Sequence, residues 1–163
     1  MRLIITDIKE LQSAQNPTQR VITDNGSIHS CIGCFGCWIK TPGQCIIKDG
    51  YEHIGEQFSK CDELTIISKC FYGGFSPFVK NVLDRAISYI SPHFVIRNGE
   101  MHHKRRYSNV IHMTVYWYGE DITEAEMKTA QSLVTANALN YDGRVNQVLF
   151  FSSADQAREA LPL

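Results

Sequence analysis

Short runs rich in Val, Ile and Thr alternate along the chain with longer stretches in which apolar residues recur every three or four positions. This alternation is typical of a parallel sheet covered by helices on both faces. The apolar run Leu64-Thr-Ile-Ile67 predicts a buried strand. Four further strands are predicted at 3–6, 20–23, 109–116 and 145–151. Because we find no repeat and no linker, we expect one layered α/β domain over residues 1–163.

Two helix starts are clearly marked in the sequence. Ser76 and Pro77 predict a cap followed by a proline at the first helical position. Thr123 and Glu126 have the spacing of a capping box, which predicts the start of a long helix. Both helices follow predicted strands, as in a βαβ arrangement.

The first two strands are joined by a short polar link. A crossover between parallel strands needs about a dozen residues or more, and this link contains Asn16-Pro17. We therefore expect either a degenerate helix or a hairpin between the strands at 3–6 and 20–23.

Composition and charge exclude several classes of protein. With 44% hydrophobic and 10% aromatic residues, the 163-residue chain is not disordered and can bury a core. A net charge of -1 gives no field that would recruit nucleic acid or an anionic membrane. No apolar run reaches the roughly 18 to 20 residues of a membrane span, and Met1-Arg-Leu-Ile-Ile-Thr-Asp7 lacks the apolar run of a signal peptide. We expect a cytoplasmic protein.

Four of the six cysteines, Cys31, Cys34, Cys37 and Cys45, lie close together in the sequence. In a reducing compartment a framework of structural disulfides is disfavoured. The first three have a compact spacing like that of ferredoxin ligands, which is compatible with a [4Fe-4S] cluster on all four thiols. Zinc fits the spacing less well. Reduced structural cysteines that pack beside Trp38 are the third interpretation, and the one we favour.

Aromatic residues and glycines follow two of the predicted strands. Lys69-Cys-Phe-Tyr-Gly-Gly-Phe75 comes after the strand at 64–67, and Trp117-Tyr-Gly119 comes after the strand at 109–116. Ligands of open parallel sheets bind at the carboxyl ends of the strands. Glycines let backbone amides approach a flat ligand that the rings could cover. These loops predict a site for a planar ligand, and the alternative is that the rings close the rim of the core.

Two segments resemble the NAD(P)H-dependent FMN oxidoreductases of flavodoxin-like fold, including their iron-sulfur flavoprotein branch. Residues 31–49 are similar to the cysteine-tryptophan signature of that family, and residues 68–85 are similar to the loop and helix that bracket the flavin ring. Residues 98–107 resemble an insertion found in one branch. The match spans most of residues 28–152.

The resemblance implies a doubly wound, three-layer α/β fold with five parallel strands, bound FMN and a homodimer or homotetramer. Electrons would pass from NAD(P)H through FMN to a small acceptor such as a quinone or free flavin. The implied ring-binding residues are Lys69, Cys70, Phe71, Tyr72 and Gly73, with Trp117, Tyr118 and Gly119 on the other side.

The first βα unit departs from the family pattern. There, a loop rich in Ser, Gly, Arg, Asn and Thr holds the FMN phosphate through backbone amides and hydroxyls. This chain has Asp7-Ile-Lys-Glu-Leu11 instead, so the carboxylates of Asp7 and Glu10 follow the strand where an anion should bind. We expect the loss to weaken FMN binding by several kcal/mol, on the scale of charge-assisted hydrogen bonds.

Three functional hypotheses follow. The leading one is a flavin-dependent NAD(P)H oxidoreductase, with no catalytic residue assigned. The second is a non-catalytic flavodoxin-like descendant that has lost FMN binding and acts as a subunit or scaffold, and the third is an iron-sulfur electron carrier.

We also expect oligomerisation to cover apolar sheet surface left bare by the missing first helix. The charged run His102-His-Lys-Arg-Arg106 is expected in a solvated loop. Motifs for hydrolysis or phosphoryl transfer are absent from the sequence.

Overall fold

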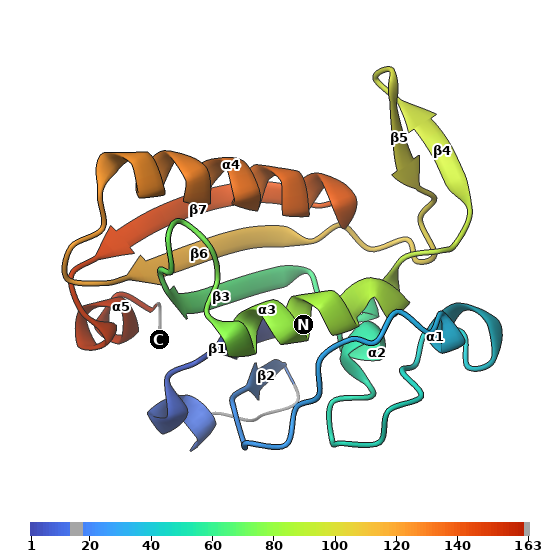
Figure 1. The fold of residues 1–163 in the computed structure, drawn as a ribbon, viewed down its shortest axis with the longest axis horizontal. Helices are drawn as coiled ribbons and strands as arrows, with labels where there is room; N and C mark the ends of the chain where they lie inside the picture. Colours follow the sequence, from blue (N-terminus) through green and yellow to red (C-terminus); the bar gives the residue numbers. More distant parts are fainter. Residues whose placement is uncertain (14–17, 162–163) are drawn as a thin grey trace.

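The computed structural model describes residues 1–13 and 18–161, whose arrangement is shown in Figure 1. The strands of the central sheet are β1 (Arg2–Thr6), β2 (Gln19–Ile22), β3 (Glu63–Lys69), β6 (His112–Tyr118) and β7 (Arg144–Phe151). Within the described residues they form a five-stranded sheet in the order β2-β1-β3-β6-β7, and every neighbouring pair is parallel. This is the flavodoxin-like strand order, so the predicted fold class is confirmed.

The first βα unit is degenerate, as one of the two alternatives predicted. β1 and β2 pair in parallel, with Ile4 opposite Val21, so the hairpin alternative is wrong. Among the described residues of this connection, the helical element is the short 3-10 helix η1 (Lys9–Ser13), which follows β1. Asn16 and Pro17, where we predicted the break, lie outside the described residues.

Most of the core lies between one face of the sheet and three helices. These helices are α2 (Ile54–Ser59), α3 (Pro77–Arg85) and α4 (Glu124–Asn140), and α3 continues into the 3-10 helix η2 (Ala86–Tyr89). Alternate strand residues point into this layer because side chains along a strand alternate between its two faces. The sheet contributes Leu3, Ile5, Leu64, Ile66, Met113, Val115 and Trp117, and the helices contribute Phe58, Val79, Val82 and Val134.

The opposite face of the sheet has a smaller apolar cluster. It is formed with η1 and the short helix α5 (Ala154–Glu159), and contains Ile4, Ile8, Val21, Ile67, Tyr116 and Ala157. Toward the amino ends of the strands, the same face has polar side chains: Arg2, Glu63, Thr65, His112 and Thr114. The expectation of a bare apolar face is therefore wrong for that half of the sheet.

Both predicted helix starts occur, although one is capped differently. Thr123 and Glu126 form the predicted capping box at the start of α4. Pro77 is the first residue of α3, as predicted, but the Ser76 hydroxyl makes no capping hydrogen bond. Instead, the Ser76 N–H donates to Ser68 Oγ over 2.9 Å, which ties the start of α3 to β3.

A β-hairpin projects from the body of the molecule (Figure 1). Its strands, β4 (Phe94–Arg97) and β5 (Glu100–His103), pair in antiparallel fashion. His102 and His103 belong to β5, so a solvated loop was the wrong expectation for them. Phe94, Ile96 and Met101 share one face of the hairpin and are exposed.

No helix in the described part of the chain combines the length and apolar character needed to cross a bilayer.

Candidate functional site

A pocket of about 440 Å³ lies at the carboxyl ends of β3, β6 and β7, beside the start of α4. We call it the rim pocket. Its position is where open parallel sheets bind ligands, and its volume lies in the range of small-molecule sites. The rim pocket is lined by Lys69, Cys70, Tyr118, Gly119, Glu120, Asp121, Ile122, Glu126, Ser152, Ser153 and Ala154.

Four of the eight residues predicted to hold a flavin ring line this pocket: Lys69, Cys70, Tyr118 and Gly119. They come from two loops that are about 50 residues apart in the sequence and adjacent in the sheet. The structure thus brings together the two loop segments singled out by sequence, at the expected end of the sheet.

Phe71, Tyr72 and Gly73 form a tight turn instead of lining the pocket. Phe71 and Gly74 exchange both backbone hydrogen bonds, at 2.9 and 2.8 Å. Tyr72 has a left-handed backbone with φ of 52°, and its side chain is 90% exposed. Gly73 packs against α4 so closely that an added Cβ would lie 2.7 Å from Thr129 Cβ. The turn therefore holds the Tyr72 ring out in solvent.

Trp117, the eighth predicted ring residue, lies in the core. Its side chain is fully buried and stacks on Phe75 with the ring centroids 4.5 Å apart. Strand alternation explains the difference, because Trp117 points toward the helices while its neighbour Tyr118 points to the other face of β6. Trp117 is therefore not part of the pocket lining.

Asp7 connects three strand ends beside the rim pocket. Its Oδ2 accepts a hydrogen bond from the Lys69 N–H, and its Oδ1 accepts one from the Tyr118 hydroxyl, both at 3.0 Å. Burial raises the pKa of Tyr118, and the charge of Asp7 raises it further. The sequence marked Asp7 as a residue unfavourable to phosphate, but gave no signal that its carboxylate clamps β1 to β3 and β6.

The residues after β1 do not fit an FMN phosphate. Such a phosphate needs backbone amides and hydroxyls as donors, whereas here the Asp7 carboxylate already accepts the Lys69 N–H. The Ile8 N–H is used by Thr6 Oγ1 at 3.0 Å. Lys69 contributes one positive charge to the lining of the rim pocket, and Glu120, Asp121 and Glu126 contribute three negative charges. The net charge of the lining is therefore -2. These charges repel a phosphate, but they do not oppose an uncharged ring.

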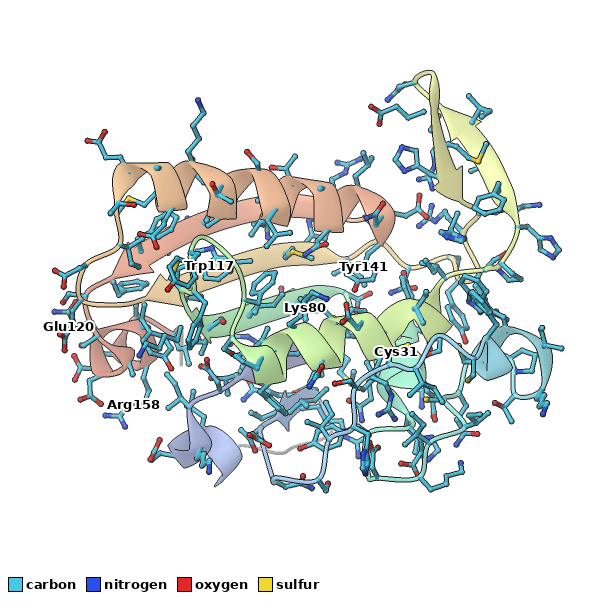
Figure 2. All side chains as sticks on the ribbon, in the orientation of Figure 1. Cys31, Lys80, Trp117, Glu120, Tyr141 and Arg158 are labelled. Atoms are coloured by element: carbon cyan, nitrogen blue, oxygen red, sulfur yellow. The ribbon has the colours of Figure 1, made fainter. Side chains whose placement is uncertain are left out.

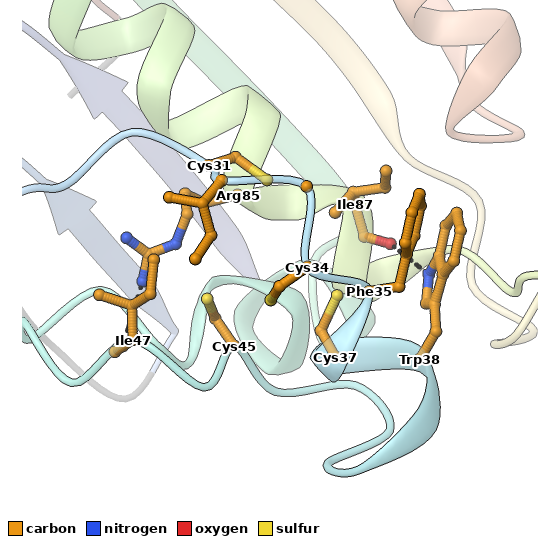
Figure 3. Close-up of a pocket in the computed structure, with 11 residues that line it drawn as sticks. Cys31, Cys34, Phe35, Cys37, Trp38, Cys45, Ile47, Arg85 and Ile87 are labelled. Atoms are coloured by element: carbon orange, nitrogen blue, oxygen red, sulfur yellow. Dashed lines mark hydrogen bonds between the residues drawn. The ribbon is translucent and has the colours of Figure 1, made fainter.

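A second, much smaller pocket of about 40 Å³ contains all four clustered cysteines (Figure 3). We call it the cysteine pocket. It lies between residues 31–47, including the short helix α1 (Gly36–Ile39), and the junction of α3 with η2. Figure 2 shows Cys31, from this pocket, and Glu120, from the rim pocket, on opposite sides of the molecule. The two candidate sites are therefore separate in this chain.

A buried ion pair between Arg85 and Asp49 anchors the cysteine segment to α3. Arg85 Nη1 lies 2.7 Å from Asp49 Oδ2, and Arg85 Nη2 lies 3.1 Å from Asp49 Oδ1. The guanidinium also donates to the carbonyls of His29 and Ile47. Burial acts to raise the pKa of Asp49, but hydrogen bonds from Arg85, the His29 N–H and the Tyr51 N–H lower it to about 2.

The cysteines do not form a recognisable metal site. Within residues 1–13 and 18–161, no group of three or more His, Cys, Asp or Glu side chains is placed to hold a metal ion. The [4Fe-4S] cluster predicted on Cys31, Cys34, Cys37 and Cys45 is therefore not supported. Cys37 is buried, as the structural interpretation requires, while Cys31 and Cys34 are exposed.

Trp38 closes one side of the cysteine pocket. Its Nε1–H is shared between the carbonyls of Ile87 and Ile90, both at 3.1 Å. Its ring stacks on Phe35 with centroids 5.3 Å apart. The tryptophan of the Cys-Trp sequence thus fixes α1 against the end of η2.

No protein-family model and no curated protein matches the sequence. Solved structures do match it. The Trp repressor binding protein from Bacillus subtilis is 13% identical over 98% of this chain and 92% of that chain, with a TM-score of 0.53. The FMN-dependent NADH-azoreductase from Bacillus anthracis, solved with FMN, is 10% identical over 97% and 92% of the two chains, with a TM-score of 0.56. At these identities the likeness concerns the fold, and the chain has the flavodoxin-like α/β fold.

Proposed function

We propose that the chain is a flavin-dependent oxidoreductase whose rim pocket binds the flavin by its ring and not by a phosphate. Electrons would pass from NAD(P)H to a small acceptor such as a quinone or free flavin. The observation that carries the proposal is the convergence of Lys69, Cys70, Tyr118 and Gly119 on one pocket at the carboxyl end of the sheet. The similarity in fold to an FMN-dependent NADH-azoreductase supports the same class of chemistry.

Bound flavin would supply the redox chemistry, and the chain would orient the ring. Lys69 lines the pocket, and its Nζ lies 5.6 Å from the centroid of the Phe71 ring. A cation there would stabilise negative charge that a ring acquires on reduction. The Tyr118 hydroxyl is oriented by Asp7, so its ring forms a fixed wall.

Binding of riboflavin and of FMN to the purified protein tests the proposal. We expect riboflavin to bind at least about tenfold more tightly than FMN, a difference of about 1.4 kcal/mol, because FMN adds a phosphate to a negatively charged site. The difference should shrink as salt is raised. Isothermal titration calorimetry at low and high salt measures both effects.

Two variants refine this test. Glu120→Gln with Asp121→Asn should increase FMN affinity and leave riboflavin affinity nearly unchanged, since it removes two charges from the lining. Lys104→Gln, a change outside the pocket lining, serves as the control. Tighter binding of FMN than of riboflavin would contradict the phosphate argument.

The second candidate, a non-catalytic subunit or scaffold, is favoured by the Asp7 clamp, which takes a donor that a cofactor would use. It predicts that neither flavin binds and that flavin does not stimulate NAD(P)H oxidation. The same titrations, with nicotinamide absorbance followed in parallel, therefore separate the two candidates. We retain a homodimer or homotetramer and a cytoplasmic location as parts of the proposal.

A further inference from the structure

The cysteine pocket brings thiols from two chain segments to one buried cation. Cys34, Cys37 and Cys45 all line this pocket, and in the view of Figure 3 the sulfur of Cys34 lies between those of Cys45 and Cys37. The two segments pack directly, because a Cβ added at Gly36 would lie 2.7 Å from Ile46 Cγ2. The Gly43 N–H also donates to the Cys37 carbonyl at 3.0 Å.

Arg85 supplies the cation. The residue is 1% exposed and lines the pocket. Its two terminal nitrogens bind Asp49 and the backbone, while its Nε has no hydrogen-bond partner within the described residues. The guanidinium interacts with the Cys45 thiol both by charge and by a hydrogen bond, and a buried donor of this kind favours an acceptor on Cys45. The pocket therefore suits a negatively charged or oxygen-bearing group on Cys45.

Cys37 and Cys45 differ in ways that suit two roles. Cys45 is partly exposed and lies beside Arg85, whereas Cys37 is buried. Burial raises the pKa of the Cys37 thiol, and among the other thiols Cys45 has the largest electrostatic effect on it. Cys37 is thus the less accessible of the two thiols, while Cys45 is open to an oxidant and lies beside the Arg85 guanidinium.

We propose that the cysteine pocket is a peroxide-reactive dithiol site, in which Cys45 is the nucleophile and Cys37 resolves the product as a disulfide. The Cys45 sulfur attacks hydrogen peroxide, an S–O bond forms, the O–O bond breaks, and one water leaves. This two-electron oxidation gives a sulfenic acid on Cys45. The Cys37 sulfur then displaces the hydroxyl group, which leaves as a second water with the Cys37 proton. In sum, two thiols and one peroxide give one disulfide and two waters.

The size and walls of the pocket favour a very small oxidant. A space of about 40 Å³ is close to that occupied by one or two waters. Its apolar walls include Phe35, Trp38 and Ile87, which would exclude a bulky organic disulfide or hydroperoxide. An external thiol would restore the pair by thiol–disulfide exchange. This site is independent of the rim pocket, so it stands or falls separately from flavin binding.

The test is treatment of the reduced, full-length protein with one equivalent of hydrogen peroxide, followed by thiol titration and peptide mass mapping. Six free thiols should fall to four, and the mapping should find a Cys37–Cys45 disulfide. Cys45→Ser should slow the loss of thiols by at least about tenfold, since it removes the proposed nucleophile. Cys37→Ser should leave a sulfenic acid on Cys45 that dimedone traps.

Matched charge variants test the part played by Arg85. Arg85→Lys keeps a charge but lacks the planar fork, and should slow oxidation of Cys45 with the fold checked by circular dichroism. Lys80→Gln removes a cation from the exposed face of the same helix and should leave the rate unchanged. Oxidation of the exposed Cys31 or Cys34 before Cys45, or an unchanged rate in Cys45→Ser, would overturn the proposal.

Discussion

The Tyr118 hydroxyl donates a 3.0 Å hydrogen bond to the Asp7 carboxylate, across 111 positions of sequence. The contact joins the end of β6 to the end of β1, on either side of β3. Asp7→Ala and Tyr118→Phe should each lower the free energy of unfolding by about 1 kcal/mol or more. Because the two changes break the same bond, the double variant should lose about 1 kcal/mol less than the sum of the single losses. Urea unfolding of the four proteins measures this coupling, and strict additivity would show that the contact contributes no free energy.

The buried Arg85–Asp49 pair should make the protein sensitive to acid. The folded-state pKa of Asp49, about 2, lies below its ordinary value of 3.8. Its contribution to stability is therefore complete above about pH 4 and is lost as the pH falls toward 2. Asp49→Asn should flatten the stability profile in that range, as followed by circular dichroism during acid titration.

The same substitution should be costly at neutral pH. Asp49→Asn leaves the buried Arg85 charge without its counter-ion, which we expect to cost about 3 to 5 kcal/mol. Asp84→Asn is the matched control on α3, because its partner Lys80 is exposed and such pairs contribute less than about 1 kcal/mol. Equal losses in the two variants would show that burial of the Arg85 pair is irrelevant to its contribution.

Gly73 should be much less replaceable than Gly99, although both have a positive φ, of 80° and 83°. An added Cβ at Gly73 would lie 2.7 Å from Thr129 Cβ and 2.8 Å from the Glu126 carbonyl, whereas one at Gly99 would meet nothing within 4 Å. Gly99→Ala should cost about 1 kcal/mol from backbone strain, and Gly73→Ala should cost about 1 to 3 kcal/mol more. Thermal unfolding of both variants tests this order.

The apolar face of the β4–β5 hairpin should take part in self-association. Phe94, Ile96 and Met101 lie exposed on that face, and Phe94 packs on His103, which in turn contacts Trp38. Exposed apolar side chains that share one face are the kind of surface at which chains associate. Ile96→Glu should shift the protein toward the monomer in sedimentation velocity at micromolar concentration. Ala136→Glu, on the exposed side of α4, should not, and a monomeric parent protein would contradict the prediction.

The sequence predicted those elements whose formation depends on residues close together in the chain. Leu64–Ile67 lies within β3, and Thr123 with Glu126 caps α4, because strand burial and capping depend on residues close in sequence. The location of the cysteines was not predictable in this way. After β2 the chain runs along α3, so the cysteine segment lies at the far end of that helix from the tight turn at residues 71–74 (Figure 1). There Arg85 binds Asp49, a contact between residues 36 positions apart that no local pattern predicts.

Trp117 was predicted to bind the flavin ring, but it is buried in the core. Its place after a strand and before a glycine suggested a rim residue, but β6 continues to Tyr118. Because Trp117 and Tyr118 both belong to the strand, side-chain alternation places Trp117 on the core face and Tyr118 on the other face. Asp7 illustrates the opposite case: its charge was evident from the sequence, while its two donors come from β3 and β6 and could be found only in the folded chain.

The two tryptophans of this chain occupy contrasting surroundings. Trp117 is sealed between Phe75 and the sheet, whereas Trp38 borders the four cysteines and stacks on the exposed Phe35. Sulfur chemistry in the pocket would alter the emission of Trp38 and leave that of Trp117 as an internal reference. The intrinsic fluorescence of Trp38 would therefore report on that chemistry without an added dye, and Trp38→Phe would identify its contribution to the emission.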